Sequence, residues 1–212
     1  LGTLVNPVTT VVDDLILSSL GGAAYISNTL NAGSILSFSG TVNGDLVLSN
    51  SNGGISLAGT VSSTTGDVSL TATGVLAMGA NTLSATAGDM SLTVAGIIGT
   101  AGHVIQTGTL TLSSSAAVGD NTTAIDTQVS SLVLSSLGGD AYIDNTAGAL
   151  TVSGTGTFGG VFDLNNTGNI TTASALQSAG DFILTSGGTL TLGSTFGVTS
   201  TTGDVTLTSA GT

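Results

Sequence analysis

The sequence contains no lysine, no arginine and no cysteine, and its acidic residues are all aspartates, which gives a formal net charge of −12. Nucleic-acid binding depends on cationic side chains that neutralise phosphates, so this class of function is excluded. Attraction to an anionic membrane surface is excluded for the same reason. Without cysteine, disulfides and thiolate sites are excluded as well.

Proline occurs once, aromatic residues make up 3% of the chain, and no apolar run approaches the roughly 20 residues that span a bilayer. We therefore expect no membrane insertion. The hydrophobic share is 40%, and it consists mainly of Leu, Val, Ile and Ala between Gly, Ser, Thr and Asn. This mixture favours many short strands joined by tight turns over a disordered acidic chain. Because the sequence begins at Leu1, we expect a piece of a longer protein.

One local pattern recurs along the whole chain: Gly, any residue, apolar, any residue, apolar, small polar. Its copies begin at Gly22, Gly44, Gly66, Gly88, Gly108, Gly139, Gly160, Gly180 and Gly203, at intervals of 22, 22, 22, 20, 31, 21, 20 and 23 residues. A period of this length matches one turn of a β-solenoid, in which stability comes from stacking neighbouring turns.

Strand geometry explains the pattern within each copy. Successive side chains point to opposite faces, so the two apolar positions share the inner face and the residue between them points to solvent. We expect the glycine to form a corner with a positive φ angle. The prediction is an all-β fold, a parallel β-helix (β-solenoid) with turns of about 20–23 residues, in which equivalent residues stack into ladders about 4.8 Å apart.

A second, longer period lies over the first. The segment Leu17-Ser-Ser-Leu-Gly-Gly22 recurs as Leu134-Ser-Ser-Leu-Gly-Gly139, an offset of 117 residues. We predict two tandem modules, residues 1–117 and 118–212, with the second cut short. The modules are expected to form one continuous rod.

The recurring Gly-Asp-apolar-x-Leu-Thr units, together with Gly139-Asp-Ala-Tyr-Ile-Asp-Asn145 leading to Gly148-Ala-Leu-Thr151, resemble the repeats of filamentous-haemagglutinin-like surface proteins of Gram-negative bacteria. The resemblance covers most of the chain, and it alone implies the handedness, that of a right-handed parallel β-helix shaft. It also implies an extracellular location and a role as an adhesin or fibrous appendage that contacts host or cell-surface glycans or proteins. It carries over no functional residue. The absence of Lys and Arg departs from typical members and favours a specialised fibre or sheath protein.

Aspartate follows the glycine in six copies, at Asp45, Asp67, Asp89, Asp140, Asp181 and Asp204. The first three are evenly spaced and predict a carboxylate ladder. One interpretation is a row of Ca²⁺ sites, because hard cations prefer oxygen ligands. The favoured interpretation is that each carboxylate accepts backbone N–H groups at the corner of a turn.

The remaining candidate sites favour structural interpretations. Asp13-Asp14 is the only adjacent acidic pair, and its counterpart is Ser130-Ser131, so a solvated loop is favoured over an acid–base pair. His103 is the only histidine and cannot build a His-based metal site or a triad alone. Thr71, Thr93, Thr185 and Thr208 occupy one repeat position, which indicates a hydroxyl ladder and not an ice-binding array.

The interval between Gly108 and Gly139 is the longest in the series. We expect its extra length to form a surface loop near Val118–Gln128 that carries Asp120, Asn121 and Asp126, with residues 1–11 as the equivalent loop. Loops on rigid scaffolds often carry binding function. If the rod binds a partner specifically, this loop is the first candidate, but an inert protrusion is the favoured interpretation.

Three functions fit these observations. The first is a non-catalytic extracellular shaft of a surface protein or fibre. The second is a filament or sheath subunit that stacks end to end with other copies or within a longer chain. The third, least favoured, is a glycan-active β-helix enzyme. The sequence assigns no catalytic, cofactor-binding or metal-binding residue, and the chain is not expected to be an enzyme.

Overall fold

The computed structural model describes residues 1–195 and 197–211, and this part of the chain forms stacked parallel strands without a helix. The strands are Val8–Thr10 (β1), Asp14–Leu20 (β2), Ala24–Val42 (β3), Leu46–Ser63 (β4), Val68–Ala72 (β5), Leu76–Ala77 (β6), Thr82–Ala85 (β7), Met90–Val94 (β8), Ile97–Ile98 (β9), Val104–Ser114 (β10), Ile125–Leu137 (β11), Ala141–Asn145 (β12), Ala149–Gly154 (β13), Thr157–Phe158 (β14), Phe162–Asn166 (β15), Asn169–Thr172 (β16), Leu176–Ser178 (β17), Phe182–Ser186 (β18), Leu190–Leu192 (β19), Val198–Ser200 (β20) and Val205–Ser209 (β21).

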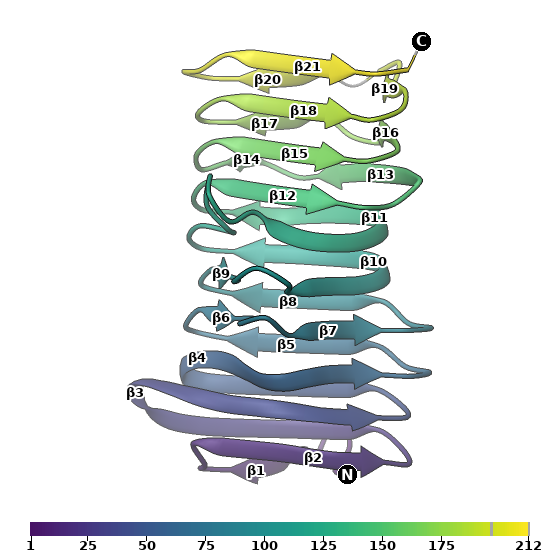
Figure 1. Cartoon of the computed structure of the whole chain (residues 1–212). Helices are drawn as coiled ribbons and strands as arrows, with labels where there is room; N and C mark the ends of the chain where they lie inside the picture. The colour runs from purple at the N-terminus through teal and green to yellow at the C-terminus, as the bar shows by residue number, and fades with distance from the viewer. Residues whose placement is uncertain (196, 212) are drawn as a thin grey trace.

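The chain winds through about ten turns, piled from the N-terminus at one end to the C-terminus at the other (Figure 1). The longest strands bend around corners, so β3 and β4 each contribute to more than one side of a turn. The predicted parallel β-solenoid is therefore confirmed. Among the described residues there is no helix of the length and apolar character needed to cross a membrane.

The repeat unit places its two apolar positions in the core, as predicted. In β4, Leu46 and Leu48 are fully buried, and the residue between them is partly exposed. Because strand side chains alternate between faces, the inward residues of every turn meet along the axis of the rod. Near the C-terminal end, the ring of Phe162 packs against those of Phe158 and Phe182, with centroid distances of 4.9 and 5.2 Å.

Most of the repeat glycines, but not Gly22 or Gly108, allow close packing between turns, and the expectation of positive φ angles was wrong. The glycines with positive φ are Gly2, Gly33, Gly40, Gly79, Gly102, Gly119 and Gly156, none of which begins a repeat copy. A Cβ atom at Gly88 would lie 2.5 Å from the carbonyl carbon of Gly66 in the turn below. Since the turns are stacked about 4.8 Å apart, only a residue without a Cβ fits there.

The repeat strands form two separate stacks and not one series. The first stack pairs Ala24, Leu46, Val68, Met90 and Leu110 in register, and the second pairs Ala141, Phe162, Phe182 and Val205. Leu110 pairs with Leu132 of β11, not with the second stack. Ala141 lies instead above Val118, which lies above Ile97 on another side of the rod. The 31 residues from Gly108 to Gly139 therefore make one full turn and then continue to another side of the rod before the next repeat strand begins.

The first residues of the two predicted modules, Leu1 and Val118, accept equivalent backbone hydrogen bonds. The N–H of Tyr25 donates to the carbonyl of Leu1 over 2.8 Å, and the N–H of Tyr142 donates to the carbonyl of Val118 over 2.9 Å. Residues 119–124, between Val118 and β11, form a loop outside the strands in which Asp120, Asn121 and Thr122 are exposed. The predicted loop is therefore shorter than expected, because β11 begins at Ile125 and includes Asp126 and Gln128.

Candidate functional site

The aspartate ladder links one turn to the next through backbone hydrogen bonds. Oδ1 of Asp45 accepts the N–H of Asp67 over 3.2 Å, and Oδ1 of Asp67 accepts the N–H of Asp89 over 2.9 Å. Asp89 accepts the N–H of Thr109 over 3.2 Å, so a threonine continues the ladder. In the second stack, Asp140 and Asp181 accept N–H groups in the same way over 2.9 Å.

This bonding agrees with the favoured interpretation of the ladder as a set of corner acceptors. The lowest member also receives a hydrogen bond from the phenol of Tyr25 to Oδ2 of Asp45 over 2.9 Å. That bond raises the pKa of Tyr25, with smaller contributions from burial and from the charge of Asp45. Within residues 1–195 and 197–211, no three His or Asp side chains are grouped as they would be around a metal ion.

A small polar pocket of about 170 Å³ lies beside the loop 119–124, and the residues that line it include Asp120, Asp144 and Asp163. Burial, followed by the charge of Asp144, raises the pKa of Asp163. Burial, followed by the charges of Asp140, Asp163 and other carboxylates, also raises the pKa of Tyr142. The sequence did not predict this pocket, because its carboxylates come from different turns.

Asp120 organises the loop 119–124. Its Oδ1 accepts the N–H groups of Thr122 and Thr123, each over 2.8 Å, and the hydroxyl of Thr122. These hydrogen bonds, led by the Thr122 hydroxyl, lower the pKa of the carboxyl group. The carboxylate predicted to mark a binding loop is thus used to hold the loop in shape.

His103 is a buried structural residue, 2% exposed. Its Nδ1 lies 2.7 Å from the carbonyl oxygen of Thr100, and its Nε2 accepts the N–H of Asp126 over 3.0 Å. The neutral ring with a proton on Nδ1 satisfies both contacts. The histidine therefore joins two turns, as the structural interpretation expects.

Two other sequence candidates occupy ordinary positions. Asp13 and Asp14 are both exposed, as expected, but the expected loop is wrong for Asp14, which begins β2 and pairs with Ser37. The backbone carbonyl of Asp13 accepts the N–H of Ser37 over 2.7 Å. The threonines of the repeat do not form one ladder. Thr71 pairs with Thr93 in the first stack, whereas Thr185 and Thr208 pair in the second.

Sequence reasoning missed a set of buried asparagines that stack along the inside of the rod. In the second stack, Asn145 donates to Oδ1 of Asn166 over 2.8 Å, and Asn166 donates to the carbonyl of Asn169 over 2.8 Å. Asn28 and Asn50 form the same arrangement in the first stack, with a bond of 2.9 Å. Every buried polar side-chain atom in the described residues has a partner. The signal was present, since asparagine recurs at the seventh position of these four repeat copies.

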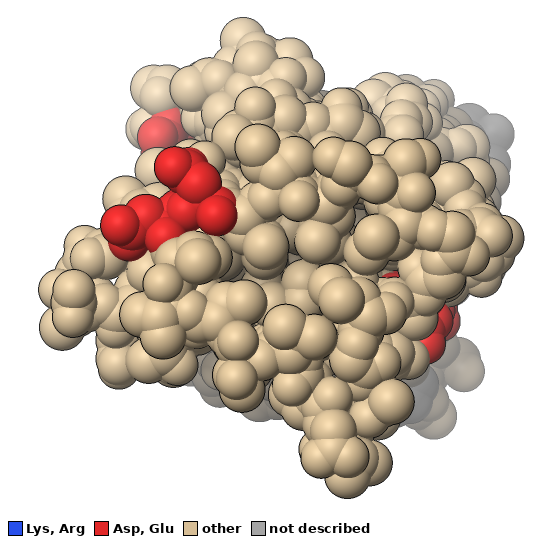
Figure 2. Space-filling view, turned by 90° about the horizontal axis from the view of Figure 1, so that it is seen from below, with Lys and Arg blue, Asp and Glu red and all other residues tan. Residues whose placement is uncertain are grey.

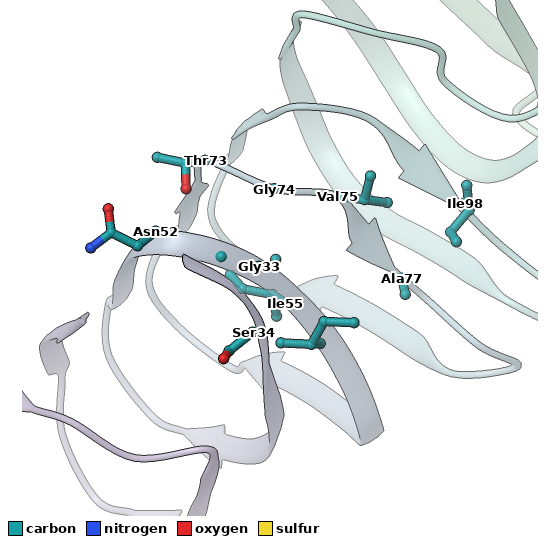
Figure 3. A pocket seen from close by; sticks show the side chains of 12 residues that line it. Gly33, Ser34, Asn52, Ile55, Thr73, Gly74, Val75, Ala77 and Ile98 are labelled. Carbon is teal, nitrogen blue, oxygen red and sulfur yellow. The ribbon is translucent and has the colours of Figure 1, made fainter. Parts of the chain in front are cut away.

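An apolar groove of about 390 Å³ lies over β6, β9 and the neighbouring parts of β3 and β4 (Figure 3). Its raised borders include Ile35, Val75 and Ile98, which are 59%, 39% and 56% exposed. Its floor includes the adjacent glycines Gly53 and Gly54, and none of the described residues that line it is an aspartate. Figure 2, viewed from the N-terminal end, shows acidic side chains gathered on two opposite sides of the molecule with uncharged surface between them.

Comparison with known proteins gives no relative: no protein-family model, no curated protein and no solved structure matches this chain. The resemblance to filamentous-haemagglutinin-like repeats therefore stays a prediction from the sequence pattern.

Proposed function

We propose that this chain is a structural rod, a segment of the non-catalytic shaft of a bacterial surface protein or fibre outside the cell. The observation that carries the proposal is that the polar groups of the repeat join neighbouring turns. The ladder aspartates accept backbone N–H groups from the turn above, and the buried asparagines bond to one another along the axis. Residues 1–117 and 118–212 are tandem modules of the proposed rod.

Because these carboxylates bond to the backbone, a glycan-active enzyme is the least favoured of the three functions. A glycan hydrolase of the usual kind needs two carboxyl groups that face each other across the substrate. In the ladders, Asp45, Asp67 and Asp89 repeat along the rod and are bonded to backbone. A shaft uses such residues in many of its turns, whereas a catalytic pair is needed only once.

A second candidate function is a filament in which rods continue end to end. In β21, Val205 and Leu207 face inward but are 43% and 41% exposed, whereas the equivalent Phe182 and Leu184 one turn below are fully buried. An uncovered turn also leaves backbone hydrogen-bonding groups free to pair with another strand. Another copy, or a neighbouring part of a longer chain, would cover this end.

Partners of the rod are expected at its projecting loops. The loop 119–124 and the equivalent residues 2–7 lie outside the strands and are mostly exposed, and loops held by a rigid scaffold often carry recognition. Host or cell-surface glycans or proteins are the partners that the sequence resemblance implies. Binding to a glycan array by the intact chain, lost when residues 119–124 are replaced by a short Gly-Ser link, would support this role.

Electron microscopy of the purified chain, with and without a chelator, tests the proposal. A shaft segment gives short uniform rods on the order of 45 Å long, because about ten turns are stacked about 4.8 Å apart. Long filaments would favour end-to-end assembly. Compact particles without this periodicity would contradict both, and loss of the rods on chelation would contradict the assignment of the aspartates to backbone bonding.

A further inference from the structure

The buried histidine holds the start of β11 through a hydrogen bond that only its neutral form can accept. Nδ1 of His103 lies 2.7 Å from the carbonyl oxygen of Thr100. A carbonyl oxygen cannot donate, so the ring proton is on Nδ1. Nε2 then carries a lone pair, which accepts the backbone N–H of Asp126 from the next turn over 3.0 Å. Both ring nitrogens are therefore occupied, and both bonds require the neutral ring.

The packing around the ring leaves no place for a second ring proton. A Cβ atom at Gly99 would lie 2.4 Å from Cε1, 2.5 Å from Nδ1 and 2.6 Å from Nε2 of His103, so the ring packs directly against the Gly99 backbone. The histidine is 2% exposed, so water does not reach it while the site is closed. A proton on Nε2 would point at the N–H of Asp126 and set two donors against each other. Because a buried donor without a partner costs free energy, the closed site favours the neutral ring.

The charged groups near the ring all come from the turns above it. Residues 99–102, and residues 79–81 that bond to this segment from the turn below, contain no ionisable side chain. The turn above contributes Asp120 and Asp126, and Asp144 pairs with Asp126 one turn further along the rod. These carboxylates attract positive charge, so they favour a charged ring that has left the Asp126 amide.

We propose that His103 is a pH-sensitive latch: protonation of Nε2 releases the N–H of Asp126 and opens the start of β11 together with the adjoining end of the loop 119–124. The other end of the loop stays closed, because the N–H of Gly119 donates to the carbonyl of Ile97 over 2.8 Å without involving the histidine. The opening is therefore local and leaves the rest of the rod stacked. The latch is a property of the fold and does not depend on whether the loop binds a partner.

The direction of the pH dependence follows from which state binds the proton. The closed latch excludes the second ring proton and the open latch takes it up, so the open fraction rises as the pH falls. An ordinary histidine side chain takes up this proton near about pH 6.5. For a single proton, the opening constant then rises by about tenfold between about pH 7.5 and 5.5.

Hydrogen exchange of the Asp126 amide, followed by NMR in the intact chain and corrected for the intrinsic exchange rate, gives the first test. Between about pH 7.5 and 5.5, protection of this amide in the wild-type chain falls about tenfold. The amide of Phe182, bonded to the carbonyl of Asp204 over 2.8 Å in the second stack, is the internal control and keeps its protection. Unchanged protection of the Asp126 amide across this range overturns the proposal.

His103→Gln is the matched variant, because its side-chain oxygen can accept an N–H and its amide group can donate to Thr100, but it does not titrate. Protection of the Asp126 amide in this variant changes by less than about twofold over the same range, because the variant has no proton to take up at this site. Effects of the carboxylates are common to both chains and cancel in the comparison. A folded variant that shows the wild-type fall in protection overturns the proposal.

The nitrogen chemical shifts of the His103 ring give a second readout in the wild-type chain, so the test does not depend on the folding of the variant. They report when Nε2 becomes protonated. Ring protonation and the loss of protection at the Asp126 amide share one midpoint if the latch works as proposed. A ring that becomes charged while the Asp126 amide stays protected overturns it.

Discussion

Replacing Asn145 with alanine tests whether the internal asparagines hold the turns together. Oδ1 of Asn145 accepts the hydroxyl of Thr127 and the N–H of Val129, each over 2.9 Å. Its Nδ2 donates to the carbonyl of Val129 over 3.1 Å and to Oδ1 of Asn166 over 2.8 Å. The residue is 2% exposed, so water cannot replace these partners without opening the stack.

The magnitude follows from the groups left without partners. An unsatisfied buried polar group costs about 1–3 kcal/mol, and Asn145→Ala strands the backbone groups of Val129 together with Oδ1 of Asn166, so we expect a loss of about 3–5 kcal/mol. For a chain of this length, each kcal/mol shifts the melting temperature by roughly 2–4 °C, which gives an expected decrease of roughly 6–20 °C.

Thermal and urea unfolding followed by circular dichroism measure this change. Asn121→Ala is the matched control, because Asn121 is exposed in the loop 119–124 and its replacement removes no buried hydrogen bonds like those of Asn145. We expect the control to unfold within about 0.5 kcal/mol of wild type, as surface substitutions usually do. If Asn145→Ala were as stable as this control, the asparagine ladder would not support the rod.

Other substitutions probe the turns, the core and the charges. Gly88→Ala should lower the free energy of unfolding by about 1–3 kcal/mol, because the added Cβ atom meets the backbone of the turn below. Gly148→Ala is the control and should be tolerated, because nothing lies within 4 Å of an added Cβ atom there. Chemical denaturation measures both variants. Phe162→Ala should cost about 3–5 kcal/mol in the same assay, because it removes a buried ring that packs against both Phe158 and Phe182. The raised pKa of Asp163 means that its ionised form is disfavoured in the folded state, so Asp163→Asn should raise the melting temperature at pH 7 and lose that advantage as the pH falls below the folded-state pKa. The lowered pKa of Asp120 has the opposite sign, so Asp120→Asn should lower the melting temperature at pH 7 and have little effect once acid has protonated the wild-type carboxyl group in both states.

Much of the local structure follows from the repeat alone. The two apolar positions after each glycine, such as Leu46 and Leu48, predict an inward-facing strand, and the structure buries both. The position of Asp67 after Gly66 predicts a carboxylate at a corner with a free backbone N–H nearby, which agrees with its bond to Asp89. These features depend only on the residues within one repeat copy and on the repeat spacing of about one turn, so the sequence is sufficient to predict them.

The placement of the second stack was not predictable in the same way. Each copy of the repeat predicts a strand, but it does not predict which side of the rod that strand occupies. The side depends on the number of residues between successive corners of the chain. Leu132 continues the ladder above Leu110, although no glycine repeat marks it, and Ala141 begins a new stack on another face. Residues 119–124 form a loop that contributes to the extra length of the interval between Gly108 and Gly139.

Two other features were missed for physical reasons. Asparagine in a repeat suggests a turn or a solvent-facing ladder, and only the stacked geometry shows that Asn28 and Asn50 satisfy each other inside the core. The groove depends on Ile35 and Val75 projecting beside glycines of neighbouring turns, which are distant in sequence. Both depend on register between turns, which composition does not determine.

The step between the two stacks is tested most directly by disulfide formation in double-cysteine variants. The structure pairs Thr111 with Val133 in adjacent turns, so Thr111→Cys/Val133→Cys should form an intramolecular disulfide rapidly under mild oxidation. A single uninterrupted stack of repeat strands would instead place Thr111 beneath Tyr142, the equivalent position of the next copy. Thr111→Cys/Tyr142→Cys should therefore remain reduced inside the monomer. Efficient cross-linking of the second variant, with failure of the first, would contradict the two-stack rod.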